Sequence, residues 1–124
     1  MHIEKNEKIW SVVIEEKDNQ LGLINIIRHL DNVNLEINEN PVEELSVELD
    51  LGALIAANSE LIAEFVIIQT SLVRNNGRLK IVNANPELKS TFDVVMLDKI
   101  ISIQYIGMDE ENVSYDDDDD YSEE

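Results

Sequence analysis

The sequence contains no cysteine and only nine basic residues among its 124 positions. Without cysteine, this chain has neither disulfide bonds nor thiolate chemistry. No stretch approaches the roughly 20 apolar residues that a membrane-spanning helix requires. The first ten residues also lack an apolar run of signal-peptide length. We therefore expect a cytoplasmic protein with no direct membrane insertion.

Motifs for several chemistries are also missing. The basic residues are not clustered, which argues against nucleic-acid binding. The only histidines, His2 and His29, are too far apart in the pattern to suggest a metal pair, and His29 is expected on a helix surface. Asn75-Asn76-Gly77 is a turn, not a phosphate-binding loop, and the scattered carboxylates define no acid/base pair. The sequence thus predicts no catalytic residue, metal site or cofactor, and no enzyme.

Negative charge is concentrated at one end of the chain. The formal net charge is −18, and Asp109 to Glu124 supplies ten acidic residues and no basic one, including the run Asp116 to Asp120. Without that segment about −8 remains, from 17 acidic and 9 basic residues. We predict one domain over residues 1–106 and a disordered acidic tail over 107–124. The aspartate run could bind divalent cations loosely, but we expect it to act as a solubilising tail.

The stretch Leu45 to Arg74 organises the rest of the chain. Apolar and polar residues alternate up to Leu51, which predicts a half-buried strand. After a small-residue turn, Leu61, Phe65, Ile68 and Leu72 recur at helical spacing. Opposite this apolar stripe, on the side expected to be exposed, we place Glu60, Glu64, Ile67, Ser71 and Arg74. The helix begins at Asn58-Ser59, where the first backbone N–H groups have no helical partner.

Strands and helices alternate along the whole sequence. We predict strands at residues 9–15, 45–51, 78–82 and 99–103, the last reaching 105, and a short strand at 33–37. We predict helices at 21–30, capped by Asp18 or Asn19, at 59–74, and from Pro86 to residue 95 or 96, capped by Asn85. A left-handed residue should end the central helix at Asn75-Asn76-Gly77. The pattern predicts an α/β fold with a four- to five-stranded mixed sheet and helices mainly on one face.

From Val47 to Ser102 the sequence resembles the STAS domain, the fold of bacterial anti-sigma factor antagonists. The family has a strand ending in Leu-Asp-Leu, then Asp-Ser-Ser-Gly opening a helix, a Gly-Gly pair, an Asn-x-x-Pro-like loop, a helix with Phe, and a Leu-x-x-Ile-Ile strand. The matching positions, in the same order and without gaps, are Leu49-Asp50-Leu51, Asn58-Ser59, Asn76-Gly77, Asn83 to Pro86, Phe92 and Leu97 to Ile101. The resemblance implies a STAS-like sheet and places Ser59 on the family's phosphorylatable serine.

The phosphorylation motif departs from the family pattern. Asn58 replaces its Asp, Glu60 adds a charge beside Ser59, and Leu61 replaces the Gly that permits close approach of a partner. Two interpretations of the serine remain open. Ser59 can be a phosphorylation switch at the positive end of a helix dipole, or Asn58 or Ser59 can simply cap that helix.

The resemblance also implies a partner-binding surface, which we assign to Asn58, Ser59, Glu60 and the exposed Ile67. The leading hypothesis is a regulatory protein-interaction module of the anti-sigma factor antagonist type, which binds a serine kinase or anti-sigma factor. The alternatives are an accessory subunit docking on a membrane transporter ATPase and a structural subunit of a signalling assembly without phosphorylation. The oligomeric state does not follow from the sequence.

Overall fold

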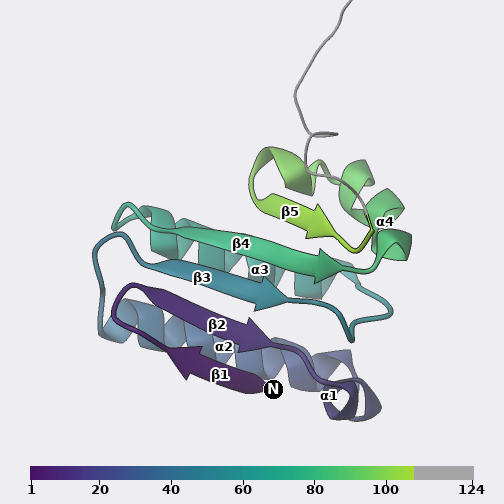
Figure 1. The fold of residues 1–124 in the computed structure, drawn as a ribbon, viewed down its shortest axis with the longest axis horizontal. Helices are drawn as coiled ribbons and strands as arrows, with labels where there is room; N and C mark the ends of the chain where they lie inside the picture. The colour runs from purple at the N-terminus through teal and green to yellow at the C-terminus, as the bar shows by residue number, and fades with distance from the viewer. Residues whose placement is uncertain (108–124) are drawn as a thin grey trace, which may run out of the picture.

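Five strands form one mixed sheet in the computed structural model, which describes residues 1–107 (Figure 1). The spatial order β1-β2-β3-β4-β5 follows the chain; β1 is antiparallel to β2, and the other neighbours are parallel. The strands are β1 (His2–Lys5), β2 (Ile9–Val13), β3 (Ser46–Asp50), β4 (Arg78–Ala84) and β5 (Ser102–Tyr105). This architecture confirms the predicted α/β class and mixed sheet, and its five strands lie within the predicted four to five.

Two long helices cover the same face of the sheet. Figure 1 shows α2 and α3 side by side behind the strands, and no described helix crosses the opposite face. Buried strand residues alternate with partly exposed ones, as in Val47 and Leu49 of β3, so the apolar side chains share the face beneath the helices. The helices are α1 (Glu16–Gln20), α2 (Leu23–Glu39), α3 (Ser59–Val73) and α4 (Lys89–Val94), with single 3₁₀ turns η1 (Pro86–Leu88) and η2 (Leu97–Lys99). The prediction of helices mainly on one face is confirmed.

Helix α2 is longer than the sequence pattern indicated. The predicted end at Leu30 and the predicted strand at 33–37 are both wrong, because α2 continues to Glu39 and buries Val33 and Ile37. Ile26, Leu30, Val33 and Ile37 follow one another at helical spacing and form a single buried stripe. The predicted cap is also wrong: Asp18 and Asn19 lie in α1, and Gly22 is the N-cap of α2.

One strand was not predicted, and another begins later than predicted. Strand β1 was not predicted; it pairs antiparallel with β2 and forms one edge of the sheet. The last strand was predicted from Lys99, but it begins at Ser102, because Leu97–Lys99 form the turn η2 and Met96 before it adopts a left-handed φ of 56°. The predicted cap at Asn85 is confirmed, since its side chain accepts a 3.0 Å hydrogen bond from the Glu87 N–H.

The turn between α3 and β4 requires a glycine. Asn76 has a φ of 63°, and the Gly77 N–H donates to the Leu72 carbonyl at 2.9 Å, which is the left-handed helix end predicted there. The chain then passes so close to the start of β3 that a Cβ on Gly77 would lie 2.3 Å from the Leu45 carbonyl oxygen. Only glycine fits this approach, which aligns Arg78 to pair with β3.

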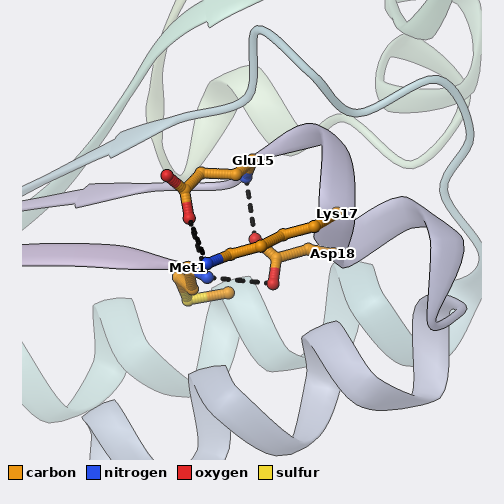
Figure 2. Close-up of polar contacts among 4 residues, drawn as sticks. All are labelled: Met1, Glu15, Lys17 and Asp18. Carbon is orange, nitrogen blue, oxygen red and sulfur yellow. Dashed lines mark hydrogen bonds and ion pairs between the residues drawn. The ribbon is translucent and has the colours of Figure 1, made fainter.

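The amino terminus is held by a buried carboxylate. Figure 2 shows the Met1 ammonium group between Asp18, at 2.9 Å, and Glu15, at 3.3 Å, while the Glu15 N–H donates to Asp18 at 2.8 Å. Burial alone would raise the pKa of Asp18, but the backbone hydrogen bond and the Met1 ammonium outweigh it and lower that pKa. This cluster joins β1 to α1 with its charges paired, as expected for a structural element.

The predicted acidic tail lies almost wholly outside the described residues, which end at Gly107. The boundary between a domain at 1–106 and the tail therefore stays a prediction. Within residues 1–107, every helix is too short or too polar to cross a membrane.

Candidate functional site

Ser59 lies at the edge of the sheet where the parallel strands end. After β3 the chain turns at Gly52, whose N–H donates to the Asp50 side chain at 2.8 Å, and the buried Leu54 fixes the loop to the core. The chain then reaches Asn58 in an extended conformation and enters α3 at Ser59. The strand-to-helix junction predicted from the sequence is thus present, and the structure places it at the carboxyl edge (Figure 1).

Asn58 caps α3, and Ser59 does not. The Asn58 side-chain oxygen accepts a 2.8 Å hydrogen bond from the Leu61 N–H, whereas Ser59 is the first residue inside the helix and is exposed. The capping interpretation therefore applies to Asn58. The Ser59 hydroxyl is left accessible at the amino end of the helix, where the dipole favours a negative charge.

The predicted partner-binding residues share the outer side of α3, the side away from the sheet. Asn58, Ser59 and Glu60 are exposed together at the start of the helix, and Ile67 is 46% exposed two turns later. Eight residues of helix separate Ser59 from Ile67, or about 12 Å along the axis. These four residues can meet one partner surface of ordinary size.

Two residues predicted to lie on that exposed side do not. Glu64 is only 7% exposed and Ser71 only 4%, because the extended α2 packs along this side of α3. The Ser71 hydroxyl donates to the Asn34 side-chain oxygen at 2.7 Å and accepts from the Asn38 amide at 3.2 Å. The seam between α2 and α3 is therefore partly polar.

Glu64 is the least satisfied group in this seam. One of its carboxylate oxygens is fully buried and has no hydrogen-bond partner among the described residues. Burial raises the pKa of Glu64, and the nearby Asp31 charge raises it further. The buried carboxylate thus weakens the packing of α3 on α2 whenever it is ionised.

An open groove separates the start of α3 from α4. It has a volume of about 520 Å³, and both Asn58 and Ser59 lie on its wall. Most of the remaining lining is apolar and comes from the two helices and the residues next to their ends: Ala57, Ile62, Ala63, Val94 and Val95, with Thr91 beside them. The predicted phosphorylation site thus opens onto an apolar concave surface.

Sequence reasoning missed the contribution of α4. Val94 is 81% exposed, and Val95 and Met96 after it are exposed as well. Val95 and Met96 follow Leu88 and Phe92 at helical spacing, so the pattern placed them with this buried stripe, and only Val94 falls outside it. Such a run at the surface is typical of a binding site.

Two further features of the described residues concern metal ligands and a buried phenol. Residues 1–107 contain no cluster of three or more His, Asp or Glu side chains arranged to hold a metal ion, and His29 is exposed as predicted. The buried phenol of Tyr105 has no hydrogen-bond partner within that part of the chain. Burial, with the charges of Asp93 and Asp98, raises its pKa to about 12, so it stays neutral at physiological pH.

Comparison with known proteins adds no assignment. No family model matches the sequence. No curated protein matches it either.

Proposed function

We propose that this protein is a non-enzymatic regulatory interaction module of the anti-sigma factor antagonist type, with a STAS-like domain and Ser59 as its phosphorylation switch. The observation that carries the proposal is the accessible Ser59 hydroxyl on the wall of an apolar groove, with Asn58 supplying the helix cap in its place. The helix after Leu49-Asp50-Leu51 begins at this serine, as it does in the family that the sequence resembles.

Phosphorylation would change the groove strongly. A phosphate on Ser59 adds about −1.5 to −2 charges. Covering that dianion with an apolar partner surface would remove it from water, which costs several kcal/mol per buried charge. Phosphorylated protein is therefore expected to release a partner that the unmodified protein holds.

The first test is the modification itself. Mass spectrometry of the protein purified from its native cells is expected to find phosphate on Ser59. The Ser59→Ala variant should lose that phosphate and still capture the protein partner, a serine kinase or anti-sigma factor.

The second test uses charge at the same position. Ser59→Asp is expected to abolish capture, whereas Ser102→Asp, at an exposed serine that begins β5, should leave it unchanged. If Ser59→Ala and Ser59→Asp capture the partner equally well, the phosphorylation switch is contradicted. That result would favour the structural-subunit alternative. Co-purification with a transporter ATPase instead would favour the accessory-subunit alternative.

A further inference from the structure

The seam between α2 and α3 holds two carboxylates, Asp31 and Glu64, that form no ion pair within residues 1–107. Helices α2 and α3 lie side by side and run in the same direction, because each connects parallel strands (Figure 1). Asn38 and Ser71 are hydrogen-bonded across the seam at 3.2 Å. Asp31 and Glu64 stand about two turns earlier on the two helices, so they face each other across the same seam. The Asp31 charge raises the pKa of Glu64, as expected for neighbouring carboxylates.

Glu64 lacks a hydrogen-bond donor where it needs one. It is only 7% exposed, and its buried carboxylate oxygen has no hydrogen-bond partner in the described part of the chain. A buried acceptor without a donor costs free energy, and an ionised one costs more. The amide of Asn38 and the hydroxyl of Ser71 are the nearest polar groups on the seam, but they bond to each other and to Asn34. The missing donor must therefore come from outside residues 1–107.

The chemistry of the two carboxylates selects the occupant. Both groups only accept hydrogen bonds when ionised, so they attract a cationic donor and repel an anion. A divalent cation held by side chains usually takes more ligands than two carboxylates offer. Residues 1–107 contain no group of three acidic or histidine side chains placed to hold a metal ion. A guanidinium group needs no such cage, because its several N–H donors lie in one plane and reach two carboxylates together.

Exposed apolar side chains stand beside both carboxylates. Leu35 follows Asp31 by one turn of α2, and Ile67 follows Glu64 by one turn of α3; both are exposed. The aliphatic stem of an arginine can lie on such side chains while its charged end reaches the carboxylates. Because Ile67 belongs to the predicted partner-binding surface, that surface continues across the seam onto α2.

We infer that Asp31 and Glu64 form a socket for an arginine side chain of the partner protein. The guanidinium group would lie between the two carboxylates, with its stem on Leu35 and Ile67. Glu64 forms the buried base of the socket, and Asp31 forms its exposed mouth. This inference rests on the proposed interaction function and extends it, because it names the side chain by which the partner is recognised.

The chain has one basic residue that could compete for the socket. Arg28 is exposed and stands one turn before Asp31 on α2, but it pairs with neither carboxylate in the described structure. Arg28→Gln is therefore expected to leave the binding of an external arginine intact.

The test uses the full chain and N-acetyl-arginine amide as the probe, followed by NMR. Saturable binding is expected to shift the side-chain carboxyl carbon signals of Asp31 and Glu64. N-acetyl-citrulline amide, which has nearly the same shape without the charge, should bind at least about tenfold more weakly.

Three variants locate the site. Glu64→Gln should weaken binding of the arginine probe about tenfold, and Asp31→Asn should weaken it less, because that charge is exposed. The matched control, Glu39→Gln, removes an exposed carboxylate at the end of α2 and should leave the affinity within about twofold. Glu64→Gln removes an unpaired buried charge, so it should fold at least as well as the wild type, and lost binding would not reflect unfolding.

Several results would overturn the inference. Equal binding of the citrulline amide, or unchanged binding by Glu64→Gln, would show that the carboxylates do not recognise the charge. A Glu64 carboxyl signal that changes in Arg28→Gln without the probe would show that Arg28 already fills the socket. Signals that respond to magnesium chloride more strongly than to the probe would indicate a metal site, and signals that respond to neither would show that water satisfies Glu64.

The outcome is separable from that of the phosphorylation test. Probe binding needs neither a kinase nor phosphate, so binding without phosphate on Ser59 would remove the switch and keep the socket. Phosphate on Ser59 without probe binding would do the reverse. Where the protein partner is captured, Glu64→Gln should reduce capture, and undiminished capture would also contradict the socket.

Discussion

Helix α3 buries polar residues on one side and exposes an apolar residue on the other, the reverse of the usual pattern. The side facing α2 buries the polar Glu64 and Ser71, whereas the outer side exposes Ile67 and leads to Ser59 and the groove. A helix packed only against a sheet would have the opposite arrangement. The difference shows that one neighbour, α2, decides which polar residues of α3 are buried and leaves the apolar Ile67 exposed.

The largest change in stability is expected from removing the polar contacts between α2 and α3. Ser71→Ala removes a hydroxyl that serves both Asn34 and Asn38, leaving the Asn34 oxygen poorly satisfied. We expect a loss of about 1 to 2 kcal/mol in the free energy of unfolding. Urea denaturation measures this, with the exposed Thr70→Ala on the outer side as the control, expected to change stability by less than about 0.5 kcal/mol. Equal losses in both variants would contradict the two-sided description.

A smaller effect, of opposite sign, is expected at Glu64. Its native pKa is raised by burial and by Asp31, so the native state holds the proton more tightly than the unfolded chain. Below the ordinary pKa both states are protonated and nothing is lost. As the pH rises through the native pKa, the unfolded state gains stability from ionisation and the fold is weakened.

Glu64→Gln removes that titration. The variant should be roughly 1 kcal/mol more stable than the wild type at about pH 7, and the gain should shrink at about pH 4. Unfolding in urea at the two pH values provides the measurement. A difference between variant and wild type that does not grow with pH would show that the carboxylate finds a partner or water.

The smallest effect on stability is expected on the outer side. Ile67→Ser removes an exposed side chain, and the two residues have similar helix propensities, so the free energy of unfolding should change by no more than about 0.5 kcal/mol. Partner capture should nevertheless weaken, because Ile67 belongs to the predicted binding surface. A large loss of stability would mean that Ile67 supports the core.

The sequence predicted the fold better than the surroundings of individual side chains. Alternation in β3 and β4 and the stripe Leu61, Phe65, Ile68 and Leu72 are local patterns, and they led to the correct fold class. The burial of Glu64 and Ser71 depends on where α2 ends. The asparagine-rich stretch after Leu30 concealed that end, because asparagine is a poor helix former whose contribution tertiary packing overrides here.

Only part of the candidate site could be predicted from the sequence, again because the rest depends on contacts between distant residues. Asn58, Ser59 and Glu60 are adjacent in the chain, so their position at a helix start could be predicted. The groove requires Val94 and Val95, more than thirty positions later, to lie opposite Ser59. That position depends on the path of the chain through β4 and η1 into α4, which no local pattern reveals. Strand β1 was missed because its pairing with β2 gives no alternating pattern of its own.

The tight passage at Gly77 has a consequence for finding relatives of this chain. Any sequence that keeps the same helix-to-strand turn must place a residue without a side chain at the position next to the Leu45 carbonyl, however far its surface has diverged. A glycine a few positions beyond an apolar helical stripe, and directly before a strand, is therefore a more durable signature of this fold than the exposed residues around the serine.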